Sequence, residues 1–297
     1  MEGYITDIQR FSLNDGDGIR TTVFFKGCNM HCTWCHNPET IEFKNNVLLY
    51  QNNCIGCGRC FKVCAQGAHI TENGVHKIDY SKCVSCGECV DKCYAEALKF
   101  SAKKMTSDEV LAQIVQDIPY YEQSDGGVTL SGGEVFCQAE FTDEIISKCR
   151  LRKIKTAVET NLCHDFDKIE KTLAKLDLIM FDIKLFDGET HKKYTGADNK
   201  IIFENAKKAD KLGIPIIVRT PLIPGVTDGA ENLKNIAEFV KTLKNARYYE
   251  LLNFNPLGGS KYKAMDKNND FASAKPFSQN RLDEIKNALS GYNVKIG

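Results

Sequence analysis

Three cysteines lie close together in the stretch from residue 27 to residue 36, namely Cys28, Cys32 and Cys35. Their C-x3-C-x2-C spacing allows one loop to hold three thiolates around one centre. Thiolates at such short spacing bind zinc, copper(I) or an iron–sulfur cluster. Zinc would need a fourth ligand, which His31, His36 or a residue elsewhere in the chain could supply in a closed structural site. A [4Fe–4S] cluster would instead keep one iron free to bind another molecule, so the spacing alone leaves both interpretations open.

Eight further cysteines form two runs with identical C-x2-C-x2-C-x3-C spacing, 29 residues apart. This is the spacing of bacterial ferredoxins, in which the fourth cysteine of each run ligates the other cluster. The pattern predicts two [4Fe–4S] clusters, one on Cys54, Cys57, Cys60 and Cys93, the other on Cys83, Cys86, Cys89 and Cys64. Two zinc knuckles are the alternative, although zinc sites rarely use cysteines in so compressed a form.

The composition narrows the class of protein. Lys plus Arg equals Asp plus Glu, at 39 each in 297 residues, so the net charge indicates neither nucleic acid nor a membrane surface as a partner. The N-terminal residues lack a basic segment followed by an apolar stretch, so we expect no signal peptide. Fourteen cysteines without a leader indicate metal ligation in a reducing compartment. We therefore expect a cytoplasmic metalloprotein.

The elements that position these cysteines alternate between strands and helices. A buried strand at 20–27 leads into the first cysteine group, and further strands are predicted at 127–131, 155–160, 176–185, 215–220 and 247–254. Helical patterns lie near 138–150, 165–175, 201–212, 230–243 and 279–289. Six β/α units predict an α/β fold, a partial (β/α)6 TIM-like barrel. Residues 46–102 would be an inserted ferredoxin-like domain, and residues 1–45 and 103–297 would form the barrel.

Polar side chains alternate with apolar ones in the strand at 176–185. Ile179, Phe181, Ile183 and Leu185 suit the helix layer, so Asp182 and Lys184 should point into the barrel. A buried ion pair that fills the lumen is the structural alternative. Because Glu159 also lies late in its strand, where barrels bind ligands, we favour a functional role.

Other strand ends carry similar residues. Gly132, Gly133 and Glu134 end the second strand, and adjacent glycines allow the backbone to approach a ligand closely. A tight turn would also explain them. Arg219 lies near the end of the fifth strand, where an arginine typically faces a carboxylate or phosphate. Asn253 shares a strand face with Asn255, and both could hydrogen-bond a polar ligand.

Together these motifs resemble the activating enzymes of glycyl radical enzymes, within the radical S-adenosylmethionine (SAM) superfamily and the subgroup with a ferredoxin-like insertion. The resemblance extends from about residue 3 to residue 262. It rests on SLNDGDGIRTTVFFKGC, the first cysteine group with Trp34, the two-cluster insertion, SGGE, Asp182-Ile183-Lys184, and Arg219 with Pro224-Gly225.

The resemblance implies three [4Fe–4S] clusters, of which the one on Cys28, Cys32 and Cys35 would bind SAM at its open iron. An electron from this cluster would cleave SAM to methionine and a 5′-deoxyadenosyl radical. The radical would take a hydrogen atom from one backbone glycine of a partner glycyl radical enzyme under anaerobic conditions. The family also implies a low-potential electron donor such as flavodoxin or ferredoxin, and we expect a monomer.

Individual positions match the family's SAM contacts. Gly132 and Gly133 match positions that approach the methionine amino group. Lys184 and Arg219 match residues that contact the methionine end or its carboxylate, and we expect Lys184 to be catalytic as well. Asp15 matches a catalytic-site residue that helps to order the site around the incoming glycine.

Further cofactor contacts are predicted at Trp34, His36, Glu134, Asn253 and Asn255. The family uses the backbone at His36 near the adenine. Asn255 stands where many relatives have a histidine that contacts SAM, so this chain departs from the pattern there.

The resemblance also implies a monovalent-cation site beside SAM. Its ligands would be Glu159 and Asp182, together with the backbone at Thr160 and Met180.

Two rival functions fit parts of this pattern. One is a radical SAM enzyme that modifies a peptide or small molecule with auxiliary clusters, although such relatives commonly place the extra clusters after the barrel. The other is a ferredoxin-type electron-transfer protein, which would leave the odd number of cysteines in the first group without a reason.

Overall fold

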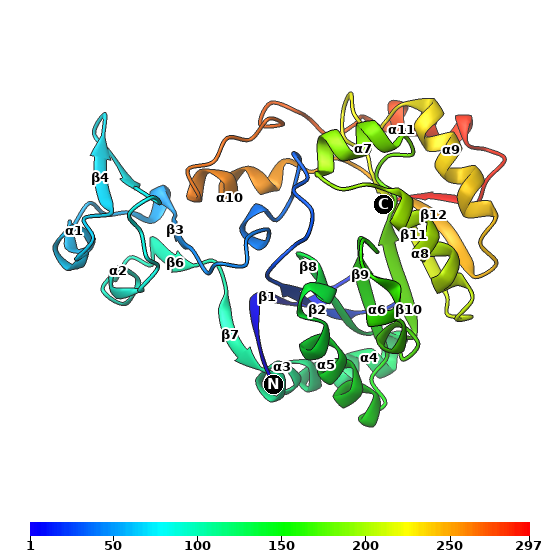
Figure 1. The fold of residues 1–297 in the computed structure, drawn as a ribbon, viewed down its shortest axis with the longest axis horizontal. Helices are drawn as coiled ribbons and strands as arrows, with labels where there is room; N and C mark the ends of the chain where they lie inside the picture. Colours follow the sequence, from blue (N-terminus) through cyan, green and yellow to red (C-terminus); the bar gives the residue numbers. More distant parts are fainter.

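A nine-stranded sheet forms the centre of the protein, and the computed structural model describes all of residues 1–297 (Figure 1). Its strands, in their order across the sheet, are β13 (Val294–Ile296), β12 (Ala246–Leu252), β11 (Ile216–Pro221), β10 (Leu178–Asp182), β9 (Thr156–Thr160), β8 (Gly127–Gly132), β2 (Arg20–Phe25), β1 (Glu2–Ser12) and β7 (Lys103–Thr106). Seven neighbouring strands run parallel, namely β2, β8, β9, β10, β11, β12 and β13. β1 pairs antiparallel with both β2 and β7.

All six strands predicted from the sequence are present in this parallel set, which confirms the α/β fold class. Three of the nine strands were not predicted. β1 buries only Gly3, Ile5 and Ser12 of its eleven residues, and β7 and β13 are only four and three residues long. Such short or mostly exposed segments carry little hydrophobic periodicity.

Helices cover one face of the sheet. These are α3 (Ser107–Ile114), α4 (Ile118–Ser124), α5 (Ala139–Leu151), α6 (Phe166–Leu173), α8 (Lys200–Asp210), α9 (Ala230–Lys241) and α11 (Gln279–Ala288). Two others lie elsewhere: α7 (Gly188–Thr195) ends beside His31, and α10 (Gly259–Ala264) packs through Ala264 on Leu48. The five helices predicted from the sequence correspond to α5, α6, α8, α9 and α11. A single core of 43 buried residues joins most of these helices to alternate residues of the strands.

The two faces of β10 separate as the sequence predicted. Ile179, Phe181 and Ile183 belong to the core under the helices. Leu185 does not, because β10 ends at Asp182 and the alternation ends with it. Leu185 packs instead in a small cluster with Trp34 above the strand ends.

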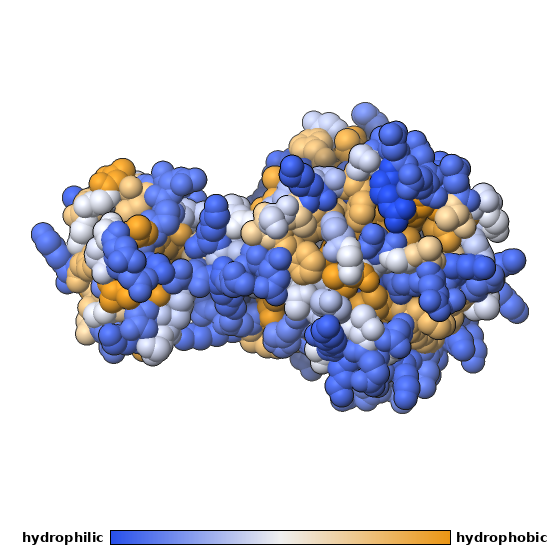
Figure 2. Space-filling model, turned by 90° about the horizontal axis from the view of Figure 1, so that it is seen from above, coloured by the Kyte–Doolittle hydropathy of each residue, from blue (hydrophilic) through white to orange (hydrophobic).

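After the first cysteine group, which stays at the body, most of the remaining chain between β2 and β7 projects from the sheet as a separate lobe, joined to the body by a narrower neck (Figures 1 and 2). The lobe contains the antiparallel pair β3 (Val47–Leu49) and β6 (Leu98–Phe100), the hairpin β4 (His69–Glu72) and β5 (Val75–Ile78), and the short helices α1 (Arg59–Val63) and α2 (Glu88–Asp91). Its apolar core contains only six buried residues. A segment with so small a core typically needs additional cross-links such as bound metal.

None of the helices combines the length and apolarity needed to span a membrane.

Candidate functional site

The loop that carries the first cysteine group begins directly after β2 and is fixed by backbone hydrogen bonds. Cys28 N donates to Ile41 O at 3.0 Å, and His31 N donates to Thr195 O, at the end of α7, at 2.8 Å. None of the fourteen cysteines forms a disulfide. The side chains of Cys28, Cys32 and Cys35 line one cavity of about 130 Å³.

The opposite wall of this cavity consists of the carboxyl ends of three neighbouring parallel strands. β8 contributes Ser131, Gly132 and Gly133, β9 contributes Glu159, Thr160 and Asn161, and the end of β10 contributes Asp182 and Lys184. The structure therefore brings together the cysteines, the glycine pair and the acid–base pair. This is the edge at which parallel α/β folds bind ligands.

The two glycines of this wall lie against the cysteine loop. A Cβ atom on Gly133 would lie 2.4 Å from Gly27 O, and Gly132 has a positive φ of 104°. Gly133 N also donates to Phe25 O at 2.8 Å. Glycine is required here because the turn after β8 packs directly on the backbone that leads to Cys28.

The charges in the cavity are paired. Lys184 is 9% exposed, and its Nζ donates to Asp182 Oδ2. Burial opposes the Lys184 charge, but Asp182 and the nearby Cys32 outweigh burial and raise the Lys184 pKa. Lys184 therefore stays cationic, which suits a carboxylate ligand.

The three thiols lie in an environment that disfavours the free thiolate. Burial raises the pKa of Cys28 and Cys32, and raises that of Cys35 to about 12. A metal centre displaces such protons, because thiolates are the form that ligates metal. Three thiols at one cavity, with no fourth cysteine among the lining residues, fit a cluster with one open coordination position.

Arg219 connects several segments beside this cavity. Its Nε donates to Glu250 Oε2 at 2.6 Å, its Nη2 donates to Asn14 O at 2.8 Å, and its Nη1 forms an ion pair with Glu159. Burial opposes the Arg219 charge, but Glu159 and Glu250 outweigh it and raise the Arg219 pKa. Arg219 therefore holds the loop before β2 against β9 and β12.

A second cavity of about 120 Å³ lies next to Arg219. Its lining includes all four residues predicted to bind a cation: Glu159, Thr160, Met180 and Asp182. Burial raises the pKa of Glu159, and Arg219 opposes that rise. Both Glu159 oxygens already have partners, since Ser131 Oγ donates to Oε2 and Arg219 pairs with Oε1.

Several predicted cofactor contacts serve other purposes in the structure. Glu134 is fully buried away from the cavity lining, and its carboxylate accepts from Thr160 Oγ1 at 2.8 Å and from Asn161 N at 2.7 Å. It therefore ties the turn after β8 to the end of β9. Asn253 binds the backbone of Phe277 with both ends of its amide, at 3.1 and 2.9 Å.

The other predicted contacts also lie outside the cavity lining. Trp34 packs in an apolar cluster with Leu185, and Asn255 Oδ1 accepts from Leu257 N at 3.0 Å, at the start of a short 3₁₀ helix. The backbone of His36 lies against Gly258. Asp15 Oδ2 accepts from Thr22 Oγ1 at 2.6 Å, in the loop that Arg219 holds.

Ser131 was predicted only as part of the SGGE motif, and two further residues at the site, Asn161 and Glu250, were not singled out from the sequence. Asn161 sits at a strand end, so the rule that found Glu159 could also have found it. Asn161 Nδ2 donates to Asn29 Oδ1 at 2.7 Å and lies 4.0 Å from Cys28 Sγ. Glu250 had no such signal, because its role depends on the pairing of β11 with β12.

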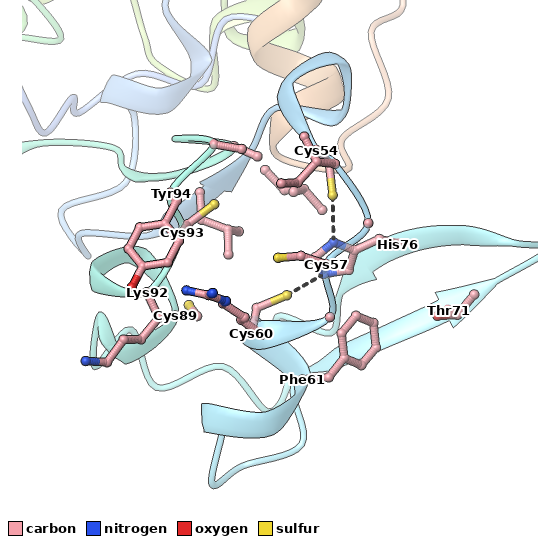
Figure 3. Close-up of a pocket in the computed structure, with 18 of the residues that line it drawn as sticks. Cys54, Cys57, Cys60, Phe61, Thr71, His76, Cys89, Lys92, Cys93 and Tyr94 are labelled. Atoms are coloured by element: carbon pink, nitrogen blue, oxygen red, sulfur yellow. Dashed lines mark hydrogen bonds between the residues drawn. The ribbon is translucent and has the colours of Figure 1, made fainter.

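The eight cysteines of the lobe surround two hollows. The first, about 320 Å³, is lined by Cys54, Cys57, Cys60 and Cys93 and also borders Cys89 (Figure 3). The second, much narrower at about 20 Å³, is lined by Cys64, Cys83, Cys86 and Cys89. Each hollow thus gathers the four cysteines that the repeat assigned to one centre, including the exchanged fourth cysteine.

A histidine pair accompanies these cysteines and was not predicted from the sequence. His76 lines the first hollow and His69 the second. Burial, reinforced by His76, lowers the pKa of His69 to about 4.

Comparison with known proteins agrees with this site. The profile of the Radical SAM superfamily matches residues 22–240. The chain belongs to the radical SAM superfamily. It is 36% identical to a trans-4-hydroxy-L-proline dehydratase activating enzyme from Clostridioides difficile, over 100% of both chains. It is also 38% identical to a (2S)-3-sulfopropanediol dehydratase activating enzyme from Klebsiella oxytoca, over 89% of this chain and 85% of the relative.

Within the superfamily, the chain therefore belongs to the activating enzymes, which confirms the resemblance inferred from the sequence. Among solved structures, a radical SAM methyltransferase from Sphaerobacter thermophilus is 14% identical over 99% of this chain and 76% of its own, with a TM-score of 0.56. This likeness extends to the fold alone.

Proposed function

We propose that this radical SAM protein activates a glycyl radical enzyme by removing a hydrogen atom from one backbone glycine of that partner. The observation that supports it best is the shared cavity of Cys28, Cys32 and Cys35, the Gly132–Gly133 turn and the Asp182–Lys184 pair. It combines a three-thiolate centre with groups suited to an amino acid. Curated relatives at 36–38% identity act as activating enzymes.

In this proposal the three cysteines hold a [4Fe–4S] cluster. When bound, the cluster supplies an open iron for the amino and carboxylate groups of SAM and the electron for its reductive cleavage. Lys184 orients a carboxylate through its charge, and Asp182 holds the Lys184 ammonium group in place. The turn at Gly132 and Gly133 brings the main chain, free of side chains, to the cavity wall.

The neighbouring cavity would hold a monovalent cation. Glu159 and Asp182 supply negative charge there, with Thr160 and Met180 beside them. Arg219 shares Glu159 with such a cation, and carboxylate oxygens have enough lone pairs for both partners.

We further propose that residues 46–102 form a ferredoxin-like domain inserted into a partial (β/α)6 barrel made of residues 1–45 and 103–297. The two sets of four cysteines would hold auxiliary [4Fe–4S] clusters. Ile55, Val84 and Tyr94 are exposed on the lobe, and Figure 2 shows hydrophobic surface at several places on it. A low-potential flavodoxin or ferredoxin is the expected electron donor.

The proposal is tested by incubating the anaerobically reconstituted chain with dithionite and SAM. We expect 5′-deoxyadenosine and methionine to form, and to be absent in the Cys32→Ala variant. Failure to form 5′-deoxyadenosine would refute the radical reaction. If 5′-deoxyadenosine forms, a glycyl radical EPR doublet in a candidate partner then distinguishes an activating enzyme from one that modifies a peptide or small molecule.

A further inference from the structure

His69 and His76 form a hydrogen-bonded pair across the wall between the two hollows of the lobe. His69 Nδ1 lies 2.9 Å from His76 Nε2. The other ring nitrogen of His76, Nδ1, lies 3.9 Å from Cys54 Sγ, and Nε2 lies 3.8 Å from Cys60 Sγ. Figure 3 shows the His76 ring among the cysteines of the first hollow.

The surrounding residues hold both rings in place. His69 is 6% exposed, and the Phe61 ring lies 4.9 Å from the His76 ring and 5.8 Å from the His69 ring, measured between centroids. His76 is part of the β4–β5 hairpin, in which Thr71 pairs with it. The position of His76 beside Cys54 is therefore determined by the fold of the lobe.

The repeat shows that this pair has no counterpart at the second centre. With a period of 29 residues, the positions equivalent to His69 and His76 are Leu98 and Met105. Leu98 lines the first hollow as His69 lines the second, as the repeat requires. Each hollow thus has one imidazole in its lining, but only that of His76 lies within 4 Å of cysteine sulfurs.

The contacts of the two rings favour one placement of the ring protons once Cys54 is a thiolate. One of the two rings must donate in the 2.9 Å contact. If His76 Nε2 donated, its Nδ1 would direct a lone pair at Cys54, which is unfavourable once that thiol is a thiolate. If His69 Nδ1–H donates instead, His76 Nε2 accepts and His76 Nδ1–H faces Cys54 Sγ. The hydrogen bond made by one imidazole nitrogen determines the tautomer at the other.

We propose that His69 and His76 are positioning residues that make the two auxiliary centres unequal, with His76 donating an N–H hydrogen bond to the Cys54 thiolate. This inference rests on the auxiliary [4Fe–4S] clusters of the proposed function. Hydrogen bonds to cluster sulfurs are among the factors that set cluster reduction potentials. A donor stabilises the more negative, reduced state, so the centre beside His76 has the higher potential of the two.

The test is an EPR-monitored redox titration of the full, reconstituted chain carrying Cys32→Ala, so that the auxiliary centres dominate the signal. His76→Phe keeps a ring against Phe61 but removes the N–H donor. In this variant we expect the reduction potential of the centre beside His76 to become more negative by at least 59 mV, which is a tenfold change in the equilibrium constant of a one-electron reduction. The other potential and the iron content should stay unchanged. His76→Gln, whose amide retains an N–H donor, should restore most of the shift, and His69→Phe should lower the same potential by less.

Phe61→Leu is the control, because it alters the packing of both rings and removes no donor. Unchanged potentials in His76→Phe, or an equal shift in Phe61→Leu, would overturn the proposal. Loss of iron in His76→Phe would also overturn it, since His76 would then be needed to hold the cluster. The iron content of the Cys32→Ala chain is measured first. Fewer than about eight irons per chain would refute the two auxiliary clusters, on which this inference rests.

Discussion

Replacing Arg219 with methionine tests whether the arginine holds the site together. Arg219 is 5% exposed and binds Glu159, Glu250 and the backbone at Asn14. Methionine keeps much of the side-chain length but removes the charge, which leaves two half-buried carboxylates without a cation. Breaking a buried ion pair in this way typically costs about 3–5 kcal/mol. We therefore expect the free energy of unfolding of Arg219→Met to fall by about that amount.

The loss should depend on pH with a defined sign. Burial already raises the pKa of Glu159 above its ordinary value of 4.5, and Arg219 opposes that rise. Without Arg219 the folded-state pKa of Glu159 rises further, so the folded state binds a proton that the unfolded state has released. Stability then falls as pH rises from about 4.5 to the new pKa and stays low above it. The variant should therefore lie closer to wild type in mildly acidic buffer than in alkaline buffer.

Urea unfolding of the anaerobic protein, followed by circular dichroism at several pH values, measures both effects. Arg247→Met is the matched control, because Arg247 forms an ion pair with Asp17 in the same loop, with side chains 41% and 51% exposed. Such an exposed pair is worth less than about 1 kcal/mol. Equal losses of unfolding free energy in the two variants would refute the stabilising role of Arg219. A loss in Arg219→Met that grows toward acidic pH would refute it as well.

Other substitutions probe individual parts of the account. Cys32→Ala should abolish SAM cleavage and lower the iron content by about four per chain; unchanged iron would contradict a cluster at the first cysteine group. Gly133→Ala should destabilise the fold by about 1–3 kcal/mol and reduce iron incorporation, because its Cβ would lie 2.4 Å from Gly27 O; a stability equal to wild type would show that the turn is not constrained. Asn253→Ala should lower the free energy of unfolding, because its two hydrogen bonds to the Phe277 backbone are lost, but leave the SAM dissociation constant unchanged. Weaker SAM binding by calorimetry, with the free energy of unfolding unchanged, would show instead that Asn253 contacts SAM.

Much of the fold could be predicted because each central strand is a buried apolar run. β10, for example, alternates between the core residues Ile179 and Phe181 and the site residue Asp182. The same reasoning located the cavity, since the ends of parallel strands meet at one edge of the sheet. The repeated cysteine spacing likewise predicted which four cysteines surround each hollow of the lobe.

The remaining features depend on contacts between distant segments. Glu134 follows two glycines at a strand end, yet its carboxylate binds Asn161, 27 residues away. Asn253 satisfies the backbone of Phe277, 24 residues further along. Glu250 and His76 acquire their neighbours only through strand pairing, so neither local periodicity nor spacing could show what they contact.

The direct test of the proposed activity is the fate of the glycine hydrogen. The reduced chain would be mixed with SAM and a candidate glycyl radical enzyme whose glycines carry deuterium at the α carbon. The account predicts 5′-deoxyadenosine that contains deuterium, together with a glycyl radical signal in the partner. Unlabelled 5′-deoxyadenosine from a partner that nevertheless acquires the radical would contradict direct hydrogen abstraction from glycine.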